Sequence, residues 1–124
     1  MRRFSLFVVP IFVFACSPPL PELEGVRMDL WQDDRNGCNG KRALMEEALT
    51  KEKDKLKGLS EMQVVELLGK PDERELYRRN QKFYSYYVTP GPDCRDREDL
   101  PKKLVVRFNA LGYAQSVTIS ASGQ

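Results

Sequence analysis

The sequence predicts an α+β domain in which two helices pack on a three- to four-stranded antiparallel sheet. Helical periodicity is confined to residues 41–68, and the residues after 72 alternate apolar and polar side chains as strands do. Short turns separate the strand-like segments and no crossover helix lies between them, which favours antiparallel pairing. A chain of 124 residues has room for one small domain of this kind.

Residues 1–15 are predicted to be a signal peptide and not part of that domain. A basic start precedes an apolar run over residues 4–15, which is too short to span a membrane. The junction over residues 13–16, Val-Phe-Ala-Cys, resembles the lipobox of bacterial lipoproteins, in which cleavage precedes the cysteine and the cysteine carries the lipid. Ordinary cleavage after residue 15 is the alternative, but it leaves Cys16 unexplained.

Removal of this leader makes the chain electrically neutral. The full chain has 20 Lys+Arg and 18 Asp+Glu, and the leader contains two of the arginines and no acid, so 18 of each remain. Nucleic-acid binding requires a basic field, so a neutral domain argues against that class of partner.

The other two cysteines, Cys38 and Cys94, are predicted to form one disulfide. An even pair in an exported domain of this size is typical of such a bond, whereas two unrelated thiols would be unusual in an oxidising compartment. The chain has no histidine, and two cysteines do not make a zinc site, so we expect neither a metal nor another cofactor.

Between the leader and the first helix, residues 16–24 form a proline-rich segment that we expect to tether the lipidated Cys16 to a domain over residues 25–120. Residues 32–37 are acidic and end in Asn-Gly. They do not match a calcium-binding EF-hand loop, because Gln32 and Ala43 stand at the first and last positions, where that loop requires carboxylates. We interpret them as a solvated turn that follows Trp31 and presents Cys38.

Two helical segments follow. Residues 41–57 are rich in good helix formers, with a narrow apolar stripe of Leu44, Met45, Ala48, Leu49 and Leu56. The second helix, over residues 60–68, has Ser60 as its N-cap and Gln63 in the position that completes a capping box. Gly69 is predicted to end it in a left-handed conformation, before a proline that prevents continuation.

Four strand-like segments complete the domain, over residues 73–79, 82–89, 102–109 and 114–120. Asn80-Gln81 lies at the turn between the first two segments, and a polar loop carrying Cys94 follows the second. Tyr84, Tyr86 and Val88 are predicted to point into the core. The tail over residues 121–124 is predicted to be frayed.

The residues of the second helix and of the strands after it resemble the pattern of a known protein family. The chain resembles the SmpA/OmlA (BamE-like) family of small outer-membrane lipoproteins over about residues 58–119, in the glycine-flanked helix, an aromatic-x-Tyr strand, and Leu104-x-Val106-x-Phe108-Asn109-x-x-Gly112. The resemblance implies two helices on a three-stranded sheet, a fold shared with the β-lactamase-inhibitor-protein-like group. It also implies an accessory subunit of the β-barrel assembly machine that bridges protein partners and contacts anionic phospholipid at the periplasmic face.

This chain departs from the family pattern in three features. They are the cysteine pair, a long acidic loop over residues 93–99, and an N-terminal segment of the domain that contains Trp31. Because related folds serve unrelated partners, these features leave the identity of the partner open. Ser17 does not resemble an inner-membrane retention signal, which favours the outer membrane, facing the periplasm of a Gram-negative bacterium.

The predicted function is that of a non-catalytic adaptor, monomeric when free. Aromatic and arginine side chains are typical of binding hot spots, so the predicted contact residues are Arg78, Arg79, Lys82, Phe83, Tyr84, Tyr86 and Tyr87, although about half of the tyrosines would then belong to the core. The alternative is an inhibitor-like module or one that binds a ligand or lipid headgroup, which requires the basic residues Arg78, Arg79, Lys82 and Arg107 to converge.

We do not expect an enzyme. The chain has no histidine, no nucleophile elbow and no phosphate-binding loop. Its closest group of acids in the sequence lies in one polar loop, where a solvated cluster is the ordinary case: Asp93, Asp96, Glu98 and Asp99.

Overall fold

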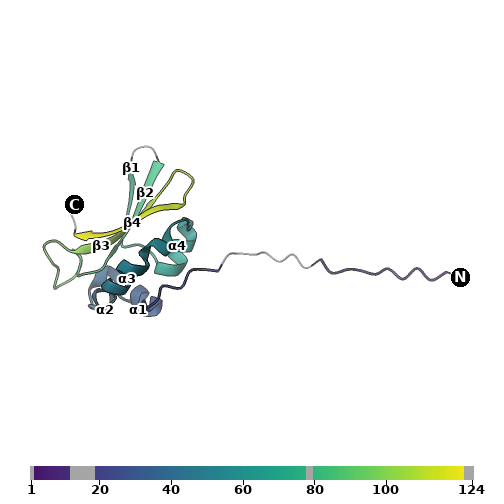
Figure 1. Cartoon of the computed structure of the whole chain (residues 1–124), viewed down its shortest axis with the longest axis horizontal. Coiled ribbons are helices and arrows are strands. Elements are labelled where there is room, and N and C mark those ends of the chain that lie inside the picture. Colours follow the sequence, from purple (N-terminus) through teal and green to yellow (C-terminus); the bar gives the residue numbers. More distant parts are fainter. Residues whose placement is uncertain (1, 12–18, 78–79, 122–124) are drawn as a thin grey trace.

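In the computed structural model, which describes residues 2–11, 19–77 and 80–121, the helices gather on one face of a four-stranded antiparallel sheet (Figure 1). This confirms the predicted α+β class. Residues 2–11 form no helix or strand. The predictions for residues 12–18, which include the lipobox and Cys16, concern residues outside those that the structure describes.

The first half of the domain contains four α-helices and two short 3-10 helices among the described residues. They are α1 (Met28–Asp33), η1 (Arg35–Gly37), α2 (Lys41–Leu44), α3 (Glu46–Glu52), η2 (Lys53–Leu56) and α4 (Glu61–Leu68). The helix predicted over residues 41–57 is therefore three pieces. The first break, between α2 and α3, lies at Met45, whose backbone has φ −98° and ψ 1°, outside helical geometry.

This break changes which side chains face the core. Met45 and Leu49 are buried as predicted, as is Leu56, whereas Leu44 is 88% exposed. A continuous helix would keep Leu44 and Met45 together on one stripe, but the turn at Met45 changes the phase of the helix between them. The prediction that Leu44 belongs to the apolar stripe was wrong.

The acidic segment before the second cysteine is also more ordered than predicted. Trp31 lies in α1 and is fully buried, with its ring 6.2 Å from that of Tyr86. Asp34, which we placed in a solvated turn, is buried as well, because its carboxylate accepts hydrogen bonds from the backbone N–H groups of Asn39 and Arg42 at 2.7 and 2.9 Å. The solvated-turn prediction was wrong at this position.

The predicted tether lies partly on the domain. Leu23 is 5% exposed within the core, and Leu20 packs against the same core from its edge. The packed part of the chain therefore begins before Gly25, because these two leucines bury apolar surface that a free linker would leave in water.

Helix α4 forms as its sequence signals predict. The side chain of Ser60 accepts a hydrogen bond from the Gln63 backbone N–H, and the Gln63 side chain accepts one from the Ser60 N–H, which completes the capping box. Gly69 ends the helix at the predicted position and with a positive φ of 84°, but the predicted left-handed helical conformation was wrong. Its ψ of −178° is extended rather than left-handed helical, a combination that is open essentially to glycine alone.

The sheet has the order β1-β2-β3-β4, with each strand antiparallel to the next. The strands are β1 (Glu73–Tyr77), β2 (Gln81–Tyr87), β3 (Lys102–Phe108) and β4 (Ala114–Ala121). Their ends agree with prediction to within about two residues where the structure describes them. Residues 78–79, the predicted end of the first strand, lie outside the described residues.

One face of this sheet forms the floor of the core. Tyr84, Tyr86 and Val88 point toward the helices and are buried, as predicted. The Tyr84 ring packs edge-on against Phe108, with centroids 4.7 Å apart. Leu104, Val106 and Val117 continue the same face through β3 and β4, and the buried faces of the helices cover it.

Candidate partner-binding surface

A disulfide ties the helical half of the domain to the loop after β2. Cys38 and Cys94 are bonded, with Cα atoms 5.2 Å apart, which confirms the predicted pair. The backbone N–H of Gly91 donates to the Asn36 carbonyl at 3.0 Å, so the two segments also meet through the main chain.

Beneath this disulfide, a buried ion pair holds α2 against the start of β1. Nη1 of Arg42 lies 2.7 Å from Oδ2 of Asp72, and both side chains are almost fully buried. The Arg42 Nε donates to the Trp31 carbonyl at 2.9 Å, and the guanidinium lies 4.6 Å from the centroid of the Trp31 ring. The Asp72 carboxylate accepts further hydrogen bonds from backbone N–H groups of Asn36 and Tyr87. These charges are satisfied inside the protein, so the cluster is a structural anchor and not an open site.

The predicted contact residues do not form one exposed surface. Tyr84, Tyr86 and Tyr87 are 8%, 0% and 4% exposed, which leaves their rings little area for a partner. Phe83 is half-buried on the sheet face away from the helices, while Lys82 is exposed and pairs with Glu61. Arg78 and Arg79 lie outside the described residues.

The basic residues required for headgroup binding also diverge. Phe83 is paired with Arg107 across β2 and β3, and Lys82 is paired with Phe108. Because neighbouring residues of a strand point to opposite faces, Lys82 and Arg107 lie on opposite faces of the sheet. The two cations therefore do not contribute to one concave patch.

Instead, the structure brings four exposed apolar side chains to one end of the domain. We call Met62, Leu76, Leu111 and Tyr113 the hairpin-end surface. Their exposed fractions are 83%, 70%, 82% and 49%. They come from α4, β1 and the turn between β3 and β4.

Backbone contacts hold these segments side by side. The N–H of Glu61 donates to the Gly112 carbonyl at 3.2 Å, and Ser60 forms an isolated β-bridge with Tyr113. Leu76 and Leu111 line the same hollow next to Glu61. No sequence pattern indicates this grouping, because its members come from three segments that are distant in the sequence and only the fold brings them together.

A second hollow of about 450 Å³ lies between α4 and β1. Met62 and Val65 line it from the helix, and Tyr84 and Arg74 line it from the sheet. The Arg74 guanidinium lies 5.2 Å from the centroid of the Tyr84 ring. Burial, and the hydrogen bond that its hydroxyl donates to Glu61, raise the pKa of Tyr84, so this hydroxyl is neutral at physiological pH.

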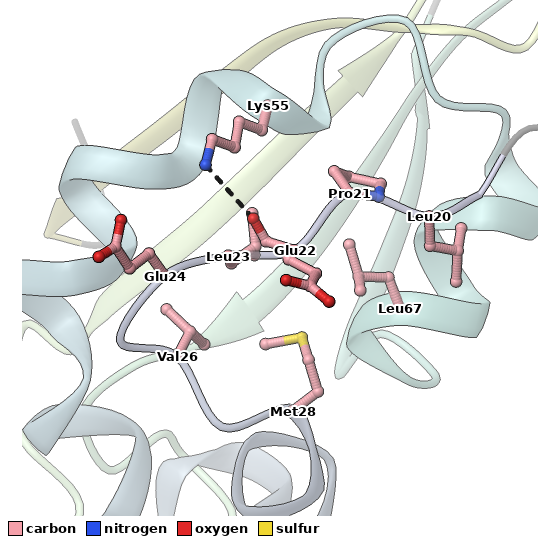
Figure 2. A pocket seen from close by; sticks show the side chains of 9 residues that line it. All are labelled: Leu20, Pro21, Glu22, Leu23, Glu24, Val26, Met28, Lys55 and Leu67. Atoms are coloured by element: carbon pink, nitrogen blue, oxygen red, sulfur yellow. Dashed lines mark hydrogen bonds between the residues drawn. The ribbon is translucent and has the colours of Figure 1, made fainter.

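A further hollow, of about 610 Å³, lies beside the predicted tether (Figure 2). Leu20, Leu23 and Val26 border it from the tether side, and Leu67 borders it from α4. Lys55 reaches across from η2, and its Nζ donates to the Glu22 carbonyl at 3.3 Å. The hollow is thus bounded by the docked tether itself.

The acidic loop after β2 is open to solvent. The side chains of Asp93, Asp96, Glu98 and Asp99 are all exposed. In the described part of the chain, no group of three or more His, Cys, Asp and Glu side chains could hold a metal ion. Within residues 2–11, 19–77 and 80–121, no helix has the length and apolar character needed to cross a membrane.

Comparison of the chain with protein-family models, with curated proteins and with solved structures finds no match in any of the three. The resemblance to the outer-membrane lipoprotein family stays a prediction that rests on the motif residues alone.

Proposed function

We propose that this protein is a lipid-anchored adaptor of the bacterial envelope that binds another protein through the hairpin-end surface. The observation that carries the proposal is that four substantially exposed apolar side chains lie around the start of α4. Met62 borders one hollow beside Glu61, Leu76 and Leu111 border another, and Tyr113 forms a β-bridge with Ser60. Contiguous exposed apolar side chains with a charged rim are typical of protein-binding sites. Glu61 and Lys82 supply that rim, with Lys82 Nζ 3.1 Å from Glu61 Oε1.

The anchor of the proposed adaptor is a lipid on Cys16. Four peptide units separate Cys16 from Leu20, which packs on the domain. Such a segment spans at most about 14 Å when fully extended. A lipidated chain would therefore be held close to the bilayer, rather than at the end of a long flexible tether.

The proposed location is the outer membrane, with the domain facing the periplasm of a Gram-negative bacterium. The motif residues support this location and make the β-barrel assembly machinery the first candidate partner. A role in envelope integrity through another protein is consistent with the same surface. The proposed activity is binding alone, without catalysis or a cofactor.

The anchor is tested by replacing Cys16. The Cys16→Ser variant is expected to lose palmitate labelling and to leave the membrane fraction, because the lipid is its attachment. A variant that lacks both Cys38 and Cys94 is the control, and it should keep the label. Unchanged labelling of Cys16→Ser would contradict the anchor.

The adaptor role is tested by detergent pull-down of the lipidated protein from its native membrane. A partner recovered at a fixed ratio should be lost from the Met62→Glu/Leu111→Glu variant. It should be retained by Leu44→Glu, because Leu44 is similarly exposed but lies on α2. If both variants recovered the same amount of partner, the proposed surface would be contradicted. If the unmodified protein recovered no partner, the adaptor role would be contradicted.

A further inference from the structure

The two edges of the sheet are protected differently. At the β4 edge, the Gly58 N–H donates to the Ala114 carbonyl at 2.8 Å, and the Ala114 N–H donates to the Leu59 carbonyl at 2.8 Å. Lys53 Nζ adds a hydrogen bond to the Val117 carbonyl at 3.2 Å. The segment over residues 53–59 therefore satisfies three backbone groups of β4, two on Ala114 and one on Val117.

The β1 edge has no such cover among the described residues. Strand β1 pairs with β2 alone, and its backbone makes no hydrogen bond to any other described segment. Backbone N–H and C=O groups at alternate positions of an edge strand point outward and are able to pair with an added strand. Arg74, Glu75 and Leu76 are all exposed at this edge.

Two of the three charged side chains of β1 have no salt-bridge partner in the described part of the chain, whereas the third, Glu73, lies 3.7 Å from Lys103 Nζ. Neither Arg74 nor Glu75 has a salt-bridge partner within 4.0 Å among the described side chains. By its register with Tyr84, Arg74 lies on the helix side of the sheet, as does Leu76, and Glu75 lies on the opposite face. The edge thus presents a cation and an apolar side chain on one face and an anion on the other.

We propose that β1 is the docking strand for an extended segment of the protein partner, which adds to the sheet in the antiparallel direction. This inference rests on the proposed adaptor function and specifies what the partner offers. Opposite residues of an antiparallel pair share a face, so the segment places an acidic residue opposite Arg74, a basic one opposite Glu75 and an apolar one opposite Leu76. Read along the partner chain, the required order is apolar, basic, acidic.

The hollow between α4 and β1 provides space for the side chains that the added strand directs to the helix side. Met62 and Val65 supply an apolar wall there, next to Arg74. Main-chain pairing then gives affinity, while alternate side chains in this hollow give specificity.

A second copy of this chain is the wrong occupant. In an antiparallel pair of β1 strands centred on Glu75, this carboxylate faces its own copy, and a pair centred on Arg74 likewise opposes two guanidinium groups. Like charges directly opposite each other destabilise a strand pair. A pair centred on Leu76 avoids both clashes, but it places neither Arg74 nor Glu75 opposite a charge of the other sign, whereas a complementary segment of another protein satisfies both charges.

The test measures binding of two synthetic peptides to the isotope-labelled full chain by NMR. The matched peptide is Thr-Thr-Ile-Lys-Glu-Thr-Thr, and its charge-reversed counterpart is Thr-Thr-Ile-Glu-Lys-Thr-Thr. The matched peptide should shift the amide signals of β1 and of Met62 and Val65. Its Kd should be at least about threefold lower than that of the reversed peptide, given two cross-strand charge pairs.

A reciprocal charge exchange distinguishes pairing from non-specific attraction. The Arg74→Glu/Glu75→Arg variant should prefer the reversed peptide. The control Glu47→Lys/Lys51→Glu exchanges an exposed pair on α3 and should keep the original preference.

Three results would overturn the proposal: shifts that map elsewhere, no binding of either peptide, or a preference unchanged by the β1 exchange. Concentration-dependent shifts of β1 without peptide would assign the edge to a second copy and would overturn it as well. Failed peptide binding, with partner recovery still dependent on Met62 and Leu111, would refute strand pairing alone. Peptide binding without any recovered partner would instead refute the adaptor function.

Discussion

The Arg42 guanidinium is surrounded by groups that the unfolded chain would leave in water. It pairs with Asp72 at 2.7 Å and donates to the carbonyls of Trp31 and Tyr87. Removal of one member of a buried pair leaves the other charge without compensation, which is far more destabilising than loss of an exposed pair. This side chain therefore links α1, α2 and the sheet.

We expect Arg42→Met to lower the free energy of unfolding by about 3–5 kcal/mol, measured by urea denaturation. The control Lys51→Met breaks the exposed pair with Glu47, in which the charged atoms are 3.6 Å apart, and should change stability by less than about 0.5 kcal/mol. Similar losses in the two variants would contradict the anchoring role.

A second residue-scale prediction concerns pH. Burial is the main reason that the pKa of Tyr86 is raised above its ordinary value of 10.0, and the hydroxyl donates to the Gly69 carbonyl at 2.8 Å. Above pH 10 the unfolded chain loses this proton while the folded chain keeps it, so stability falls as pH rises. The stabilisation that the raised pKa of Tyr86 provides is fully present below pH 10 and is lost as the pH rises further.

Tyr86→Phe should therefore lose about 1 kcal/mol at pH 7, because the hydrogen bond is removed. Above pH 10 its stability should decline less steeply than that of the wild-type protein. Denaturation curves at pH 7, 9 and 11 measure both effects, and identical slopes above pH 10 would show that Tyr86 does not titrate differently in the two states.

At the scale of the elements, the junction after α4 depends on Gly69. A Cβ atom there would lie 3.1 Å from Cγ of Gln32, and the positive φ of 84° already disfavours other residues. Gly40 is the matched control, since it has a φ of 77° and no atom within 4 Å of the same position.

Gly40→Ala should be destabilised by about 1 kcal/mol through its left-handed backbone alone. The backbone cost at Gly69 is higher, because its positive φ with an extended ψ is open essentially to glycine alone. Gly69→Ala should lose more, because its neighbour must also move. Thermal unfolding of the two proteins tests this order, and a larger loss in Gly40→Ala would contradict it.

The elements that could be predicted are those with local signals. Helix α4 has a capping box and a terminal glycine, and the strands alternate, so their places follow from the sequence. Helix α1 has only six residues and no side-chain cap, so no local sequence signal predicts it. The burial of Asp34 and the exposure of Leu44 depend on contacts and a kink that arise only in the folded chain.

At the scale of the whole molecule, one disulfide joins segments 56 residues apart. In the chain-entropy model, such a link contributes about 4 kcal/mol by restricting the unfolded state. We expect the reduced protein to unfold at a correspondingly lower urea concentration. Equal midpoints for the reduced and oxidised proteins would show that the bond contributes nothing to stability.

The candidate site was less predictable than the fold. The aromatic cluster in β2 suggested a contact surface, but the sheet buries most of its rings. Met62, Leu76 and Leu111 are isolated apolar residues in segments that are distant in the sequence. Only the register of the sheet and the packing of α4 on it bring them to one end of the domain.

The adaptor claim is tested most directly by site-specific photo-cross-linking in the cells that make this protein. A photoreactive residue is placed at Met62, at Leu111 or at the control position Leu44, and each variant is irradiated in intact cells. We expect one discrete cross-linked species of the same mass from Met62 and Leu111, and none from Leu44. No species at the first two positions, or the same species at all three, would contradict a partner bound at the hairpin-end surface.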